Sequence, residues 1–331
     1  MTNLEKKNDS SLLEHAAEIV EAISSENTRI AYQSDIRQFR AWGAGKGVEV
    51  LPSNPDLIGV YIVYLSAIGR KPSTIQRALT AINQWHLSQG YDSPITERVK
   101  RLRKGVNRLH GTSQRKVKAI TWPILDRLLN YVPNSAIGIR DRALLLVGFA
   151  GAFRRSELVS INTDDISFEA EGMVIVQGRT KTNQEGRARK IAIPFIDIEG
   201  RCPVKAVRAL IDYNQLSTGP LFYNLGTSGR LNKKLILGNR LKPAAVASIV
   251  KKYIKLAGYD QREFSAHSLR AGFATSAAQA GLRSGEIMGH TGHKTYSVLM
   301  GYIRDGRLFQ GHPLTAIVNA STASDSNSRS Q

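Results

Sequence analysis

The sequence predicts a mainly α fold, with an all-helical N-terminal domain followed by a mixed, mostly α domain that contains a small antiparallel β-sheet. Three observations support this prediction. Apolar residues recur at helical spacing in both halves of the chain, two β-branched runs interrupt that pattern in the second half, and a basic stretch separates the halves. The 331 residues are sufficient for two domains with cores of their own.

The N-terminal half is expected to contain only helices. Residues 11–23 have the composition of a short helix, and three stronger helical patterns follow. The first pattern carries Phe39 and Trp42 on one stripe and ends at Gly43, and the third ends at Gly90. The residues expected to cap or begin these three helices are Asn27 or Thr28, Asn54 or Asp56, and Ser73.

A change in composition marks the boundary between the halves. From Val99 to Lys118 the chain contains many Lys and Arg residues and no acidic residue, which favours contact with nucleic acid over an ordinary solvated helix face. The last residues are polar and of low complexity. The predicted division is a helical domain over 10–105, a basic linker over 106–118, a mixed domain over 119–312 and a partly disordered tail over 313–331.

The mixed domain begins with two predicted helices, in "TWPILDRLLNYV" and "IRDRALLLVGFAGA". The β-branched runs Val174–Val176 and Ile191–Ile193 then flank a turn-rich basic segment, so they predict a hairpin. Helical patterns resume after Val204. The sheet is therefore expected to be small and local.

The charge of the chain narrows the choice of partner. A formal net charge of +19 favours a polyanion, with nucleic acid as the first candidate and an anionic membrane as the second. No apolar run is long enough to span a bilayer, and the polar N-terminus lacks a signal-peptide pattern. We therefore expect a protein of the cytoplasm, associated with the nucleoid and not with a membrane.

A single cysteine, Cys202, excludes an internal disulfide framework and a cysteine-based zinc cluster. No histidine-containing motif surrounds it, so we interpret Cys202 as structural. No metal-ligand set and no phosphate-binding glycine-rich loop appear elsewhere in the sequence. The chain is thus expected to need neither a metal nor a cofactor.

Two pairs of residues in the mixed domain place charged groups at helical spacing. Arg154 precedes Glu157 by three residues, so on a helix the carboxylate would brace the guanidinium. In "FSAHSLRAGF", with Ser265 as N-cap, His267 and Arg270 fall in the first turn of a helix. The positive end of the helix dipole disfavours cations there and favours a bound phosphate. The second pair therefore indicates an anion site.

Two further stretches carry candidate functional residues. Lys181 in "GRTKTN" follows the first β-branched run, where a hairpin would present its ammonium group. His293 precedes Tyr302 by nine residues on a predicted helix. His290 belongs to a second Gly-His pair, and the residue nine positions after it is Leu299. If His290 were the functional histidine, Leu299 would therefore stand at the position that Tyr302 holds relative to His293. The presence of a tyrosine nine residues after His293 favours His293 over His290 as the functional histidine.

Taken together and in chain order, these residues resemble the signature of the tyrosine recombinases, the integrase family. The Cre-like branch is the most similar, through "GRTKT", the run from Glu286 through Arg304, and "RLRK" at the start of the linker. The resemblance covers nearly the whole chain. It implies a SAM-like core-binding domain, a basic linker and a catalytic domain.

The resemblance also implies roles for individual residues. Tyr302 would attack a DNA phosphodiester and remain joined to it as a 3′-phosphotyrosine. Arg154 and Arg270 would hold the non-bridging oxygens in the transition state, and Lys181 would protonate the departing 5′-oxygen. His267 would exchange the tyrosyl proton.

Two other residues would support this chemistry. His293 would donate a hydrogen bond to the phosphate, and Glu157 would support the site without touching the substrate. Tyr296 and Arg155 are alternatives to the chosen tyrosine and arginine. Tyr296 would point to another side of the helix, and Arg155 is not three residues before the glutamate.

The function implied is site-specific DNA recombination by a homotetramer on paired sites, through a Holliday junction and without metal, ATP or cofactor. The alternatives are type IB topoisomerase activity, or a catalytically silent DNA-binding or architectural protein with the same fold. The partner would be double-stranded DNA with specific recombination sites. The residues expected to contact it are Arg77, Lys100, Arg101, Arg103, Lys104 and Arg179.

Overall fold

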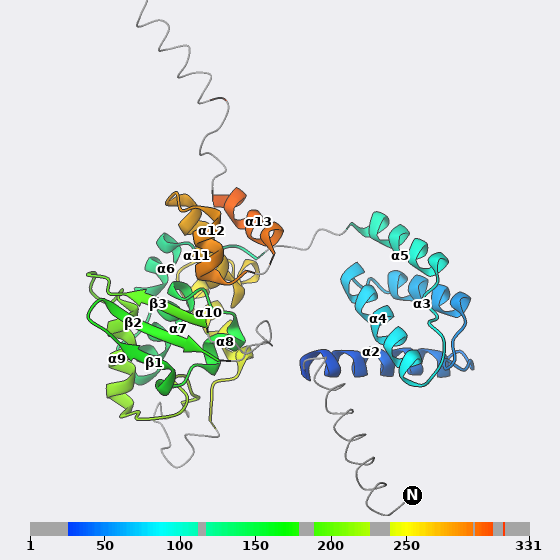
Figure 1. Ribbon diagram of the computed structural model, residues 1–331, viewed down its shortest axis with the longest axis horizontal. Helices are drawn as coiled ribbons and strands as arrows, with labels where there is room; N and C mark the ends of the chain where they lie inside the picture. Colours follow the sequence, from blue (N-terminus) through cyan, green and yellow to red (C-terminus); the bar gives the residue numbers. More distant parts are fainter. Residues whose placement is uncertain are drawn as a thin grey trace, which may run out of the picture. The chain divides into compact units, whose positions relative to one another are not determined.

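The computed structural model describes residues 26–111, 117–178, 189–225, 239–293, 295–306 and 314. The chain divides into two compact units, Met1–Arg115 and Lys116–Gln331, drawn in blue to cyan and in green to orange in Figure 1. The division falls inside the predicted linker. The described residues are mostly helical with one small antiparallel sheet, as the sequence predicts.

The N-terminal unit contains the helices α2 (Glu26–Ala44), α3 (Pro55–Ala67), α4 (Pro72–Ser88) and α5 (Glu97–His110). Asn54 caps α3 as predicted, because its side-chain oxygen accepts the backbone N–H of Leu57 at 2.8 Å. Ser73 does not cap α4: Lys71 is the N-cap residue and Pro72 takes the first helical position, where its missing N–H costs no hydrogen bond. The short helix predicted over 11–23 lies outside the described residues.

Aromatic and aliphatic residues of α2, α3 and α4 form the core of this unit, with Phe39, Tyr61 and Ile82 fully or almost fully buried. α5 joins that core through Val99 and Val106, on the apolar side of a helix whose other sides are basic. The helix therefore continues into the segment that the sequence assigned to the linker, because Val106 has a core to pack against.

The second unit contains α-helices, short 3-10 turns and three strands among its described residues. In chain order these elements are α6 (Trp122–Leu129), α7 (Ala136–Ala150), α8 (Arg155–Ser160), η1 (Thr163–Asp165), β1 (Ile166–Phe168), β2 (Gly172–Gln177), β3 (Arg189–Pro194), α9 (Pro203–Asn214), α10 (Pro243–Leu256), η3 (Gln261–Glu263), α11 (His267–Gln279), α12 (Ser284–Thr291) and α13 (Tyr296–Gly306).

The sheet has the order β1-β2-β3, with both pairs antiparallel. Its β2–β3 pairing confirms the predicted hairpin strands and places Ile175 opposite Ile191. The short strand β1 was not predicted, because three residues are too few to show an alternating pattern. Met173, Ile175, Ile191 and Ile193 face the core, where α7 is buried almost all round.

Close backbone contacts fix the position of α11. A side chain at Gly272 would collide with the carbonyl oxygen of Ile120, and the Ile120 N–H donates to the carbonyl of Ser268 at 2.9 Å. α13 packs along α11 and, towards the C-terminal part of that helix, Gly306 approaches the backbone of Thr275. These two helices, which carry the candidate residues His267, Arg270 and Tyr302, therefore meet with little room to shift.

Within the described segments of the chain, no helix combines the length and the apolar character that a membrane span requires.

Candidate active site

The nucleophile candidate and the base candidate meet across the α11–α13 contact. The hydroxyl of Tyr302 lies 3.0 Å from Nε2 of His267, which is a hydrogen-bond distance. Burial lowers the pKa of His267, and the nearby cations Arg270 and Arg154 lower it further. The imidazole is therefore neutral at physiological pH, with a nitrogen available to accept the tyrosyl proton.

Arg270 lies one turn further along α11 and is completely buried, with 0% of its surface exposed. Its Nη1 donates to the carbonyl oxygen of Ala152 at 2.7 Å. Among the described residues its Nε and Nη2 have no hydrogen-bond partner. Burial, followed by the repulsion of Arg154, lowers the pKa of Arg270 to about 10, so the guanidinium stays charged. A buried cation with two donors left over is built to hold an anion.

The turn between α7 and α8 brings Arg154 to the same site. Ala152 has a φ of 48°, a left-handed conformation that costs a residue with a side chain about 1–2 kcal/mol, and this turn aims its carbonyl at Arg270. Arg154 is the N-cap residue of α8, not a residue on its face as the spacing suggested. The exposed Arg155 begins the helix and is turned to solvent.

Glu157 holds Arg154 through both its backbone and its side chain. The buried carboxylate accepts two hydrogen bonds from Arg154: one from the backbone N–H at 2.8 Å and one from Nη1 of the side chain at 2.5 Å. One carboxylate thus caps the helix and orients the guanidinium together. The expected supporting position of Glu157 is consistent with this geometry.

His293 lies beside the tyrosine, with a ring-centroid distance of 5.9 Å to Tyr302. The Thr291 hydroxyl lies 2.7 Å from the Ile287 carbonyl, a pure acceptor, and 2.6 Å from Nδ1 of His293. Because the hydroxyl has one proton and the carbonyl needs it, Nδ1–H of His293 donates to Thr291. Burial and the surrounding cations, Arg270 first, lower the pKa of His293 to about 3. Its buried Nε2 has no partner among the described residues.

The competing residues occupy different surroundings. His290 has other partners: its Nε2–H donates to the carbonyl of Ala150 at 2.6 Å, and its ring stacks on Phe273. Leu299, the position that alignment on His290 would select, is fully buried in an apolar cluster. Tyr296 is 54% exposed at the start of α13. The geometry thus favours the register in which His293 and Tyr302 belong to one site.

One cation of this site was missed in the sequence. Arg189, the first residue of β3, contacts the carbonyl of His290 through Nη2. Its charge contributes to the lowered pKa values of Arg270, His290 and His293. The sequence contained a signal for it: alternate residues of a strand face the same side, so Arg189 shares the inward face of β3 with Ile191 and Ile193.

Lys181 and Arg179 lie outside the described residues, so their expected roles rest on the sequence. The expected DNA contacts of the N-terminal unit are described. Arg77 forms two hydrogen bonds to the buried carboxylate of Asp35, at 2.8 and 3.0 Å, and Lys100 pairs with Glu97 at 2.7 Å. Arg77 therefore has a structural role in the fold, because two of its nitrogens already pair with Asp35.

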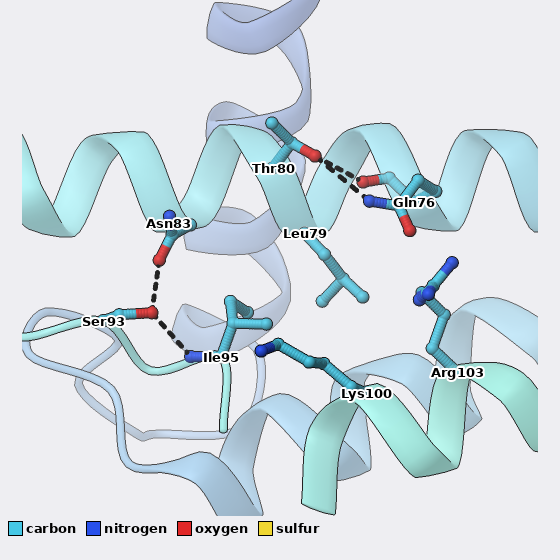
Figure 2. A pocket seen from close by; sticks show the side chains of 8 residues that line it. All are labelled: Gln76, Leu79, Thr80, Asn83, Ser93, Ile95, Lys100 and Arg103. Carbon is cyan, nitrogen blue, oxygen red and sulfur yellow. Dashed lines mark hydrogen bonds between the residues drawn. The ribbon is translucent and has the colours of Figure 1, made fainter. Parts of the chain in front are cut away.

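Figure 2 shows a shallow pocket between α4 and α5 in this unit. α4 contributes the polar side chains of Gln76, Thr80 and Asn83, and α5 contributes the cations Lys100 and Arg103. Arg101 and Lys104 of α5 are also exposed. Amide and hydroxyl groups beside cations are the combination with which proteins contact bases and phosphates.

The comparison with known proteins decides the family. A sequence model of the phage integrase family matches residues 120–307, more than half of the chain. The chain belongs to the phage integrase family. It is 35% identical over 322 residues to an integrase/recombinase XerD homolog of Selenomonas ruminantium, covering 96% of this chain and 93% of that protein. The predicted family is confirmed.

A second relative bears on the predicted Cre-like branch. The Cre recombinase of Escherichia phage P1 is 26% identical over 301 residues, covering 85% of this chain and 84% of Cre. This identity is lower than that to the XerD homolog, so the predicted Cre-like branch receives only loose support.

Solved integrase-family structures share the fold. A XerH recombinase bound to a palindromic difH substrate has a TM-score of 0.63 at 17% identity, covering 87% of this chain and 78% of that chain. A lambda integrase dimer bound to a core site has a TM-score of 0.59 at 16% identity, covering 92% and 96%. The predicted fold class is thus confirmed, and the family places this chain among the tyrosine recombinases, enzymes of site-specific DNA recombination.

Among the described residues there is no group of three or more His, Cys, Asp or Glu side chains that could hold a metal ion.

Proposed function

We propose that this recombinase cleaves and rejoins DNA through a 3′-phosphotyrosine on Tyr302, exchanging strands through a Holliday junction. The observation that carries the proposal is one site in which a tyrosine hydroxyl contacts a neutral histidine and a buried arginine has two unused donors among the described residues. A phenol is a weak nucleophile until a base takes its proton, and a phosphodiester reacts slowly until its charge is neutralised. This site contains a base candidate for the tyrosine, His267, and a cation that can neutralise the phosphate, Arg270.

In the cleavage step the oxygen of Tyr302 bonds to the phosphorus while the bond to the 5′-oxygen breaks. The tyrosyl proton passes to Nε2 of His267, and Lys181 gives its proton to the departing 5′-oxygen. Arg154 and Arg270 hold the non-bridging oxygens, where they supply positive charge in the way that a metal ion does in other phosphoryl-transfer sites. The phosphotyrosyl bond keeps the energy of the broken linkage, so religation to a new 5′-hydroxyl needs no ATP.

The role of His293 depends on the substrate. In the free protein its Nε2 carries no proton, because the Nδ1–H donates to Thr291 and the pKa is low. A phosphate next to Nε2 would offset the charges of Arg270 and Arg154 and raise that pKa. His293 thus becomes a donor to the scissile phosphate on DNA binding.

The partner we propose is double-stranded DNA with specific sites, bound by a homotetramer on two paired sites. The solved relatives named above are recombinases on their DNA sites, and the +19 charge suits a polyanion. The polar and basic pocket between α4 and α5 supports a DNA contact by the N-terminal unit, with Lys100, Arg101, Arg103 and Lys104. Such a function would place the protein at the nucleoid.

Covalent adduct formation tests this proposal. Nicked duplexes with candidate sites from the protein's genetic neighbourhood would be incubated with wild type and Tyr302→Phe in EDTA without ATP, then resolved on denaturing gels. We expect an adduct with wild type and none with Tyr302→Phe, which lacks only the attacking oxygen. Site-specific binding by wild type without an adduct would instead indicate an architectural protein. Adducts that relax supercoils but never exchange strands between two sites would indicate a topoisomerase.

A further inference from the structure

Arg189 is a cation of the site that the signature residues do not include. It opens β3 opposite Gln177 of β2, and both side chains lie on the core side of the sheet. The Gln177 amide donates to the carbonyl of Glu157 at 3.5 Å, so this end of the sheet borders the Arg154–Glu157 pair. A charge at an inward-facing strand position is costly unless it has a partner there.

The partner of Arg189 is the turn that leads to His293. Its Nη2 contacts the carbonyl oxygen of His290, one of the last carbonyls of α12, which has no partner within the helix. Its guanidinium also lies against Gly292, where the Cβ of any larger residue would be 2.8 Å from Nη1. Gly292 has a φ of 65° and ends α12, so a glycine suits both the backbone conformation and the close approach.

The same turn is held from its other side. The His290 ring donates to the Ala150 carbonyl and stacks on Phe273 at 4.4 Å. Arg189 and these contacts therefore fix the backbone of residues 290–292 between the sheet and α7. His293 follows directly, and its ring lies against Tyr302.

We propose that Arg189 is a positioning residue of the recombination reaction, which clamps the His290–Gly292 turn and so places His293 against the scissile phosphate. This inference rests on the proposed function and adds a residue to it. Arg189 also begins the strand that follows the segment containing Lys181, so the clamp ties that strand to the turn that precedes the nucleophile helix. A displacement of about 1 Å in such a contact can cost on the order of a hundredfold in rate.

The test is the single-turnover rate of adduct formation on a nicked site. We expect Arg189→Met to lower this rate on the order of tenfold to a hundredfold, with DNA affinity and thermal unfolding close to wild type. Arg189→Lys should recover part of the loss, because an ammonium group can still donate to the His290 carbonyl. Lys190→Met is the matched control: it removes one charge from the next, exposed position of the same strand and should cleave like wild type.

A double-mutant cycle separates positioning from a general loss of charge. If Arg189 acts through His293, Arg189→Met should cost little in a His293→Ala background. An equal loss in both backgrounds, or wild-type cleavage by Arg189→Met, would overturn the inference. If Arg189→Met does not fold, the same cycle with Arg189→Lys decides the matter. Failure of wild type to form any Tyr302-dependent adduct would instead overturn the proposed function itself.

Discussion

Two buried arginines of the second unit, Lys116–Gln331, differ in what surrounds them. Arg140 of α7 is 8% exposed and uses all three of its side-chain nitrogens: Nε and Nη2 donate to Asp141 at 3.0 and 2.6 Å, and Nη1 donates to the carbonyl of Tyr223 at 3.4 Å. Arg270 of α11 is 0% exposed and donates only to the carbonyl of Ala152, among the described residues.

The difference distinguishes a structural cation from a functional one. Asp141 compensates the charge of Arg140 and also accepts from the hydroxyl of Tyr253, so that network is complete without a ligand. Burial, followed by the repulsion of Arg154, lowers the pKa of Arg270 to about 10. Folding brings these two cations together at a cost, which a bound phosphate would offset.

The largest expected effect comes from Arg270→Gln. We expect the cleavage rate to fall by on the order of two to four decades, because the transition-state charge loses its buried donors. Because Gln removes a buried charge that Arg154 repels, the free energy of unfolding should stay within about 1 kcal/mol of wild type or increase. Single-turnover cleavage and urea unfolding on the same samples check both parts. A large loss of stability with normal cleavage by the folded fraction would contradict this assignment.

The matched change, Arg140→Met, should have the opposite profile. Removing one partner leaves Asp141 buried with Tyr253 and the more distant Lys252 as its remaining partners among the described residues, so we expect about 3 kcal/mol of destabilisation. Cleavage per folded molecule should remain near wild type at a temperature where the variant is folded. Urea unfolding measures the first quantity and adduct yield measures the second. A cleavage defect as large as that of Arg270→Gln would remove the distinction between the two arginines.

The smallest effect concerns His293, a second buried group with an unused nitrogen among the described residues. Because its folded pKa of about 3 lies below the ordinary value, the unfolded chain binds its proton first as the pH falls, and stability is lost below about pH 6.5. Between about pH 7.5 and about pH 5.5, His293→Gln should therefore lose about 1 kcal/mol less stability than wild type. His267 and His290 are present in both proteins, so the difference isolates His293. Equal pH dependence of urea unfolding in the two proteins would argue against the buried, neutral state.

The sequence predicts most of the fold because its signals are local. The stripe ending at Trp42, the cap at Asn54 and the β-branched strands all follow from spacing and propensity, and the structure contains each of them. The errors are also local. Ser73 is a good capping residue, but Pro72 before it already fits the first helical position, and α5 extends because a core is available to Val106.

The site could be predicted only as far as a family resemblance reaches. Positions separated by more than thirty residues, such as His267 and Tyr302, are brought to 3.0 Å by the small-residue packing of α11 on α13, which no local pattern encodes. The strained turn at Ala152, whose carbonyl meets Arg270, and the clamp by Arg189 depend on where distant chain segments meet. Such contacts arise from tertiary packing, so spacing alone could not give them.

Identification of the residue that becomes joined to DNA tests the central claim most directly. Adduct trapped by wild type on a nicked site would be digested with nuclease and protease, and the peptide that retains a nucleotide would be mapped by mass spectrometry. The account predicts the nucleotide on Tyr302, whose hydroxyl contacts His267. A nucleotide on the exposed Tyr296, or on any other residue, would contradict the assignment of the nucleophile and of the site built around it.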